Sequence, residues 1–202
     1  TFQETHLIDN IAENTFSNMK IKYKKIPFKP IGSDERQYSS PGFRIPMSVI
    51  CKSQFHNFDY YHTSLDNLEF VSSDSILQTY LIYINIIENL ENLQESQVKP
   101  IVKHTQKNPK NSKYPVYETL NPFCEPMLSK RGLYPELGGA LFQPSDFSKN
   151  NSYDIELLST ILFYSDSNTT VEQISDKSGF SKSEIEQISE KLVTVNLLKR
   201  VR

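Results

Sequence analysis

Apolar side chains recur at helical spacing in two stretches of the first half of the chain, and each stretch predicts a helix. The first predicted helix covers residues 3–17, and the second begins at Ser73 or Asp74 and runs to about Leu93. The apolar positions of the second helix make a wide stripe, so we expect one of its faces to pack on a sheet. The stripe consists of Ile76, Leu77, Tyr80, Leu81, Ile84, Ile87 and Leu90.

Between these helices, the pattern changes to short runs typical of strands, each followed by a polar loop. Apolar residues alternate with lysines over 21–26, and residues 43–52 form an apolar run with β-branched side chains. The loops 28–42 and 53–67 follow these two runs. This order predicts an α/β domain, and ligand sites in open α/β sheets gather in loops at the carboxyl ends of strands.

A helical period returns near the C-terminus, after a polar stretch at 94–113 and a connector punctuated by Pro and Gly at 114–139. Two capping-box patterns begin at Thr169 and Ser181, and Gly179 lies between them as a helix stop. A helix, a short helix, a turn, a helix and a short strand in this order predict a winged helix-turn-helix module.

Composition and charge narrow the classes of function and the compartment. The 22 basic and 24 acidic residues give a net charge of −2, which offers no general argument for nucleic acid or an anionic membrane as a partner. No apolar run approaches the length of a membrane span, and the first residues do not resemble a secretory signal. Two cysteines with no disulfide pattern are typical of reduced thiols, so we expect a cytoplasmic protein.

The two polar loops carry the residues that are the clearest candidates for catalysis or binding. Three charged residues in succession, from Asp34 to Arg36, follow Gly and Ser and can present carboxylates into a cleft, or they form an exposed turn that caps a helix. His62 lies between aromatic and small polar residues, where a neutral imidazole can bind a metal. Alternatively, His62 is a partly buried residue beside a helical turn that begins at Thr63 or Ser64.

Four short motifs in order resemble the aminopeptidase-like family associated with polysaccharide biosynthesis, a distant relative of the co-catalytic zinc aminopeptidases. The loops contribute Gly32–Tyr38 (Gly-Ser-Asp-Glu-Arg-Gln-Tyr) and Tyr61–Leu68 (Tyr-His-Thr-Ser-Leu-Asp-Asn-Leu). The later motifs are Asn121–Pro126 (Asn-Pro-Phe-Cys-Glu-Pro) and Lys130–Tyr134 (Lys-Arg-Gly-Leu-Tyr). The resemblance covers nearly the whole chain apart from residues 94–113.

This resemblance implies a fold and a metal site. The fold class is α/β: part of a zinc-peptidase-like α/β domain over 1–120, a connector over 121–149, and a winged helix-turn-helix-like module over 150–202. His62 corresponds to the last metal-binding His of the zinc aminopeptidases, and Asp34 belongs to the Ser-Asp segment near the metal. The residues expected to support the ligands or face the substrate are Glu35, Arg36, Tyr38, Thr63 and Asp66.

The chain departs from the family pattern in ways that limit the implied chemistry. Such enzymes take their other ligands from a His-x-Asp motif, a bridging Asp and a Glu-containing motif, and none of these is present. One His and one Asp are too few for catalytic zinc, which usually has three protein ligands. Relatives also tend to have Cys where Ser39 stands. The expected site is therefore incomplete in this chain, and no catalytic residue is assigned.

Three functions remain open at this point. The first is a zinc-dependent aminopeptidase-like hydrolase that cleaves an amide bond of a small, peptide-like or carbohydrate-linked substrate. The second is a non-catalytic protein that binds a carbohydrate precursor or a partner, and the third is a transcription regulator that uses the C-terminal module. A homo-oligomer is compatible with the sequence.

Nucleic acid is not an expected partner of the C-terminal module. The apolar stripe of its last helix leaves Glu184, Glu186 and Glu190 among the outward positions, although helices that enter DNA normally present basic side chains. Three basic residues at the end of the chain, in 199–202, supply the best case for DNA because they are placed where a wing would be.

Overall fold

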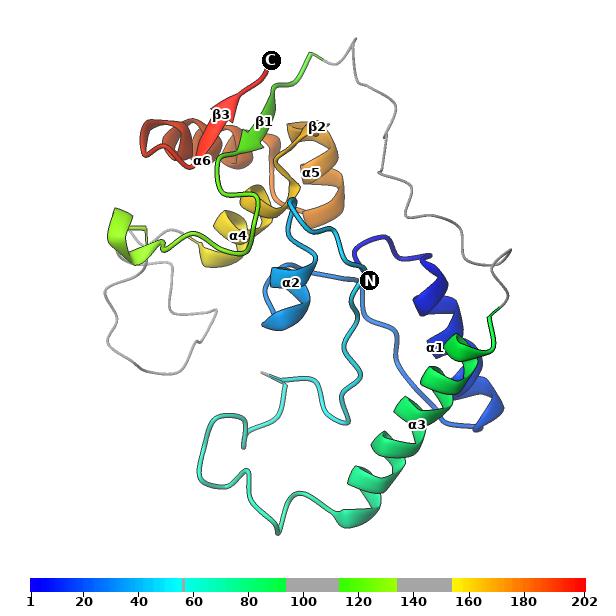
Figure 1. The fold of residues 1–202 in the computed structure, drawn as a ribbon. Helices are drawn as coiled ribbons and strands as arrows, with labels where there is room; N and C mark the ends of the chain where they lie inside the picture. The colour runs from blue at the N-terminus through cyan, green and yellow to red at the C-terminus, as the bar shows by residue number, and fades with distance from the viewer. Residues whose placement is uncertain (56, 94–112, 134–153) are drawn as a thin grey trace. The chain divides into compact units, whose positions relative to one another are not determined.

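The computed structural model describes residues 1–55, 57–93, 113–133 and 154–202. These residues fall into two compact units, and each is described by itself. The N-terminal unit consists of the described residues of Thr1–Phe28 and Ser48–Ile101, and the C-terminal unit consists of those of Lys29–Met47 and Val102–Arg202. The chain combines helices with a small antiparallel sheet (Figure 1).

Two helices make up the core of the N-terminal unit. Helix α1 (Leu7–Asn18) and helix α3 (Ser73–Glu91) begin and end close to the predicted positions. Ile11 of α1 is buried against Ile82 and Ile86 of α3. Burial of these aliphatic side chains provides the main driving force for the pairing of the two helices. Partly buried apolar residues surround them: Leu7, Ile8, Ala12, Phe16, Met19, Ile21, Ile50 and Leu93.

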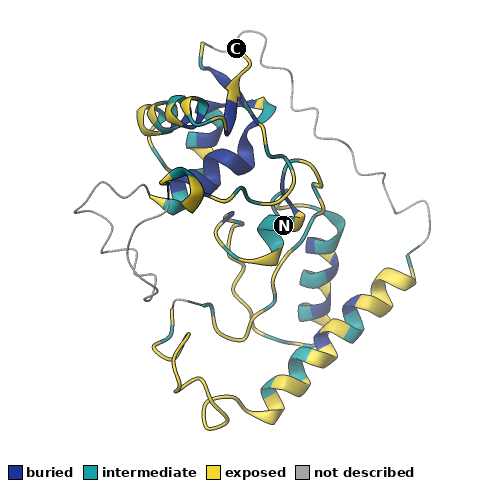
Figure 2. Ribbon diagram, turned by 60° about the vertical axis from the view of Figure 1, so that its left-hand side comes forward, coloured by how far each residue is buried: buried dark blue, intermediate teal, exposed yellow. Residues whose placement is uncertain are grey.

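The apolar stripe predicted for α3 is not the face that packs. Six of its seven members are exposed, and Figure 2 shows most of α3 in the colour of exposed or intermediate residues. The helix instead buries Ile82 and Ile86, because α1 is its packing partner and the described part of this unit contains no strand. The exposed members are Ile76, Leu77, Tyr80, Leu81, Ile87 and Leu90.

The two strands predicted before α3 are absent from the structure as strands. Residues 21–29 and 44–51 lie without regular secondary structure. A β-strand needs a neighbour to accept and donate its backbone hydrogen bonds, and no described residue pairs with either segment in a sheet. Helix α2 (Asp34–Tyr38) lies within the stretch predicted to be a loop.

The C-terminal unit contains α2 and a three-stranded antiparallel sheet in the order β2-β1-β3, together with the later helices α4, α5 and α6. Val116 of the central strand pairs with Thr170 of β2, and Tyr117 pairs with Arg200 of β3. The elements in chain order are β1 (Val116–Thr119), the 3-10 helix η2 (Ser129–Arg131), α4 (Ile155–Tyr164), β2 (Asp166–Thr170), α5 (Val171–Ser178), α6 (Lys182–Thr194) and β3 (Leu198–Arg200).

The central strand β1 lies in the segment that the sequence presents as an unstructured connector. Its four residues are too few to show a two-residue period, and both of its partners follow it by more than 40 positions. The pairing buries Val116 and Tyr117. The first strand of the winged-helix sheet therefore comes from outside the run of residues whose periodicity reveals the module.

Helix α4 is the centre of this unit. Every residue from Leu157 to Tyr164 is buried, and Figure 2 shows this helix almost wholly in the buried colour. The following helices each turn one apolar face inward, with Ile174 of α5 and Ile185 of α6 almost fully buried. Burial on all sides explains why the apolar residues of α4 do not keep to a single stripe.

The helix ends follow local capping chemistry. Ser181 and Glu184 form the predicted capping box of α6, while the box of α5 joins Thr170 to Gln173, one residue later than predicted. Gly179 ends α5 in the left-handed conformation with φ of 82°, in agreement with the predicted helix stop.

We expect Gly179→Ala to destabilise the C-terminal unit by about 1 kcal/mol, because an added Cβ is unfavourable at positive φ. Urea unfolding followed by circular dichroism measures the change. Ser183→Ala, at an exposed position in the first turn of α6, is the matched control and should have almost no effect. Equal unfolding midpoints for the two variants would contradict this account of the helix end.

Candidate functional site

His62, the main candidate metal ligand, lies in a series of turns in the N-terminal unit. Its side chain is exposed, its φ is 59°, and its ring stacks on that of Tyr61 with centroids 4.0 Å apart. The Thr63 hydroxyl donates to the Tyr60 carbonyl at 2.8 Å and accepts from the Leu65 N–H at 3.2 Å. Thr63 therefore fixes the turn that follows His62.

The remaining predicted residues divide between the two units. Asp66 is exposed and close to His62 in sequence, whereas Asp34 and Tyr38 are exposed residues of α2 in the C-terminal unit. Glu35 accepts a hydrogen bond from the Ser33 N–H at 3.1 Å, which is a local contact at the start of the helix. Among the described residues, no group of three His, Cys, Asp or Glu side chains is placed to hold a metal ion.

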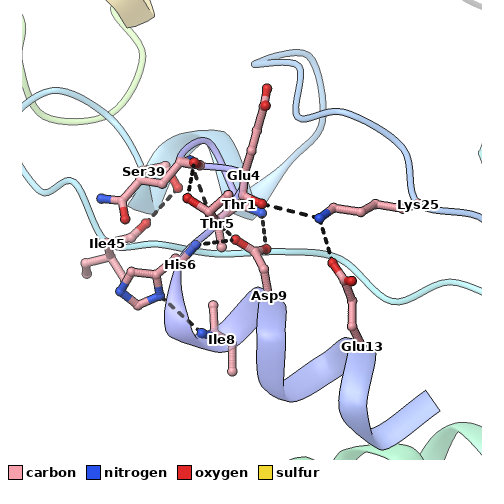
Figure 3. Close-up of polar contacts among 11 residues, drawn as sticks. Thr1, Glu4, Thr5, His6, Ile8, Asp9, Glu13, Lys25, Ser39 and Ile45 are labelled. Carbon is pink, nitrogen blue, oxygen red and sulfur yellow. Dashed lines mark hydrogen bonds and ion pairs between the residues drawn. The ribbon is translucent and has the colours of Figure 1, made fainter. Parts of the chain in front are cut away.

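His6 has a structural role at the start of α1. Its Nδ1 accepts a hydrogen bond from the Ile8 N–H at 3.3 Å, and Asp9 accepts one from the His6 N–H at 2.9 Å (Figure 3). Partial burial lowers the pKa of His6, and the nearby Asp9 carboxylate opposes this shift without reversing it. His6 thus caps the helix as a neutral imidazole.

Asp9 is itself held in the charged state by several donors. It accepts from the Thr1 ammonium at 2.6 Å and from the Thr1 hydroxyl at 2.7 Å, as Figure 3 shows. Burial alone raises the pKa of Asp9, but these hydrogen bonds outweigh it and the net shift is downward. The buried carboxylate is accounted for by helix capping and needs no metal.

Two of the four sequence motifs meet in the C-terminal unit. Arg36 of the first motif forms an ion pair of 2.8 Å with Glu125 of the third, and both side chains are partly buried.

Residues that follow the first motif also contact the third. The Gly42 N–H donates to the Pro122 carbonyl at 2.6 Å. The Ser40 hydroxyl accepts a hydrogen bond from the Cys124 N–H at 3.0 Å. The rings of Phe43 and Phe123 pack edge to face with centroids 5.0 Å apart. The third motif therefore contacts both the first motif and the residues that follow it, through Phe43.

Arg44 joins the first motif to the winged-helix part of the same unit. Its guanidinium donates to the carbonyl oxygens of Ser39 at 3.3 Å and Phe163 at 3.1 Å, and it pairs with Asp166 at 3.3 Å. Burial lowers the pKa of Arg44, and the charge of Asp166 opposes the shift. Sequence reasoning missed this residue, because a single Arg in an apolar run carries no periodic signal.

A small hollow lies between α2, the Asn121–Pro126 segment and α4. Its volume is about 30 Å³, enough for about one water molecule and far too small for a substrate. Two polar atoms at its lining residues, Nε of Arg36 and Oγ of Ser159, have no hydrogen-bond partner among the described residues. This hollow offers a place for a bridging water at the interface between the first motif and α4.

A larger hollow of about 450 Å³ lies in the N-terminal unit beside the two unpaired extended segments. Its lining includes Lys22, Lys24, Lys25 and Lys52 together with apolar residues of α1 and α3. None of the predicted site residues contributes to this lining.

Comparison with known proteins confirms the resemblance predicted from the four motifs. A protein of Clostridium acetobutylicum, provisionally named a polysaccharide biosynthesis protein with an aminopeptidase-like domain, is 34% identical over 194 residues. This match covers 96% of the present chain and 38% of the relative. The chain thus spans about two fifths of the length of that protein.

Further comparisons assign the two halves separately. The model of a family described as a domain of unknown function (DUF4910) matches residues 1–93, and one described as winged helix-turn-helix matches residues 115–200. The second match confirms the predicted module. A solved structure from C. acetobutylicum, provisionally described as a peptidase, is 29% identical with a TM-score of 0.39, covering 100% of this chain and 37% of that one.

The structure also bears on the cysteines and on the length of the helices. Cys51 and Cys124 are both free and exposed. No helix in the described ranges is long and apolar enough to cross a membrane.

The capping role of His6 predicts a dependence of stability on pH. Because the pKa of His6 is lowered in the folded state, its cap is complete above about pH 6.5 and is lost as the pH falls through the folded-state value. His6→Asn keeps a capping acceptor that does not titrate. We expect wild type to lose up to about 1 kcal/mol relative to His6→Asn between pH 7 and 5. Urea unfolding at each pH measures this difference, and parallel pH profiles would contradict it.

Proposed function

We propose that this chain, a relative of the aminopeptidase-like polysaccharide biosynthesis proteins, is part of a cytoplasmic hydrolase. Its reaction would be cleavage of an amide bond in a small, peptide-like or carbohydrate-linked substrate. The observation that carries the proposal is the 34% identity to the C. acetobutylicum protein over nearly the whole chain. The contact between the first and third motifs supports it, since residues far apart in sequence come together in one structured region.

Zinc is the metal that we propose for the complete hydrolase, with His62 and Asp34 as ligands. The described residues do not fit a complete zinc site by themselves: His62 and Asp34 belong to separate units, and no third ligand is placed beside either. Zinc needs three protein ligands in most catalytic sites. The other ligands would have to come from polypeptide outside the described residues, so we assign no reaction step to the metal.

Within this chain, the proposed role of the first motif is to hold side chains at fixed positions. Arg36 is held by Glu125, and Gln37 donates to the same carboxylate at 3.5 Å. Asp34 and Tyr38 remain exposed on the same short helix and are free to face a ligand or substrate. Thr63 and Asp66 would orient the turn that presents His62.

We further propose that the winged-helix module does not read DNA. Lys199 pairs with Glu118 at 2.8 Å, and Arg200 pairs with Glu190 at 2.9 Å. Lys182, at the start of α6, pairs with Glu172 at 2.6 Å. Basic side chains that neutralise phosphates supply most of the affinity of DNA-binding proteins. In this module, nearby acids compete for the same side chains.

Zinc binding by the 202-residue chain tests the proposed count of ligands. We expect calorimetric titration to show no binding tighter than about 1 µM, because the two proposed ligands are fewer than the three that catalytic zinc usually takes. Elemental analysis of the complete gene product should show zinc that His62→Ala removes and His6→Asn retains. Tight binding by the short chain that is lost in His62→Ala would show that it contains further ligands.

A gel-shift assay with duplex DNA at about 50 mM salt, which favours electrostatic binding, tests the role of the module. We expect no retardation by wild type or by the triple variant Lys199→Gln, Arg200→Gln, Arg202→Gln. Retardation by wild type that disappears in the triple variant would establish a DNA-binding wing and overturn this part of the proposal.

A further inference from the structure

The first motif lies within one family match, but in the structure it packs against residues of the other family match. Residues 29–47 fall within the match to the domain of unknown function, which covers residues 1–93. In the structure, the same residues form one compact unit with the winged-helix residues. Residues 29–47 therefore match one family in sequence but fold together with residues that match the second family.

We propose that the winged-helix module is an internal scaffold that holds the Gly32–Arg44 segment in place, with Arg44 as the positioning residue. The consequence for catalysis rests on the proposed function, because Asp34 and Arg36 of this segment are its candidate site residues. The positioning itself is a property of the fold and can be measured without any activity.

The carbonyl groups at the end of α4 explain why Arg44 is an effective anchor. The last carbonyl oxygens of a helix have no partner within the helix and carry partial negative charge. Phe163 lies in the last turn of α4, and its carbonyl accepts from Arg44 at 3.1 Å. The guanidinium also lies over the Phe163 ring, 4.9 Å from its centroid. One cation thus satisfies the end of the buried helix and packs on its surface.

Asp166 completes the anchor and ties it to the sheet. Its Oδ2 pairs with Arg44 at 3.3 Å, while its Oδ1 accepts from the N–H groups of Asn168 at 3.0 Å and Thr169 at 2.9 Å. These hydrogen bonds hold the carboxylate at the start of β2, so Arg44 meets a fixed partner. The side chains of Arg44 and Asp166 are only 23% and 25% exposed. Loss of this partly buried pair therefore destabilises the docked state more than loss of an exposed ion pair would.

Backbone contacts transmit the anchor from Arg44 to α2. The Ile45 N–H donates to the Tyr38 carbonyl at 3.0 Å, and the Ser39 hydroxyl donates to the Ile45 carbonyl at 2.7 Å. The fully buried Ser39 joins the end of α2 to the residue after Arg44 (Figure 3). This closed loop makes the position of α2 depend on that of Arg44.

Lys29, which precedes the Gly32–Arg44 segment in the chain, has a weaker contact with α4. Lys29 pairs with Glu156 in the first turn of α4 at 2.6 Å, but its side chain is 56% exposed. Exposed ion pairs contribute little to stability. Lys29 is therefore a matched control: a cation that pairs with α4 from the same segment without being buried.

Hydrogen exchange of the whole chain, followed by mass spectrometry, tests the scaffold. We expect Arg44→Met to speed exchange of the amides of Ser39 and Ile45 by at least about tenfold, while those within α5 and α6 stay protected. Lys29→Met should leave all of them unchanged. Arg44→Lys, which keeps one charged donor, should restore part of the protection, a graded rescue not expected if only packing volume mattered.

The other possible results of the hydrogen-exchange experiment also support or reject the scaffold. Equal exchange of the Ser39 and Ile45 amides in wild type and Arg44→Met would overturn the proposal. If Arg44→Met also exposes α5 and α6, Asp166→Asn decides, because it removes the charge but keeps the Oδ1 acceptor. Selective loss of protection in Asp166→Asn supports the scaffold, and no change rejects it. Loss of protection as predicted, together with a complete gene product that holds no zinc and cleaves no amide bond, would retain the scaffold and reject the proposed function.

Discussion

Burial of α4 is the constraint on which the C-terminal unit depends. Eight consecutive residues of this helix are buried, so each of its surfaces must be covered by another element. Helices α5 and α6 pack against part of α4, and strand β2 of the sheet begins directly after the end of α4. A helix buried to its last turn leaves carbonyl oxygens away from water, where an unpaired acceptor is unfavourable. Arg44 meets that requirement from a segment more than 100 residues earlier.

The helices were predictable because they obey local rules. The 3.6-residue period locates α1 and α3 to within a few residues, and the serine and glycine signals locate the ends of α5 and α6. The error in the face of α3 has a physical cause. Apolar residues surround much of that helix, so composition alone does not select the side that meets α1. Strands were harder, since β1 depends on partners that follow it by more than 40 positions.

The sequence named candidate site residues but did not predict their contacts. Arg36 and the Asn121–Pro126 segment were noted as parts of separate motifs, and only the structure joins Arg36 to Glu125. That the first motif docks on the winged-helix module was not predictable, because a docking contact leaves no period in either sequence. Arg44 shows the difficulty most clearly: its partners Phe163 and Asp166 are ordinary residues at a helix end and a strand start.

The scaffold and the charge pairs of the module point to the same use of the winged-helix fold. In a DNA reader, the third helix and the wing carry cations whose preferred partners are phosphates. Here Lys199 and Arg200 lie beside carboxylates of the module itself, and the Tyr117 hydroxyl donates to Glu190 at 2.7 Å. Burial and the negative charge of Glu190 raise the pKa of Tyr117, which keeps it a donor. The hydrogen bond of the buried Tyr117 helps to hold β1 beside α6, whereas the two exposed ion pairs contribute little to stability. These contacts agree with our proposal that the winged-helix fold of this chain holds the segment anchored by Arg44 and does not read DNA.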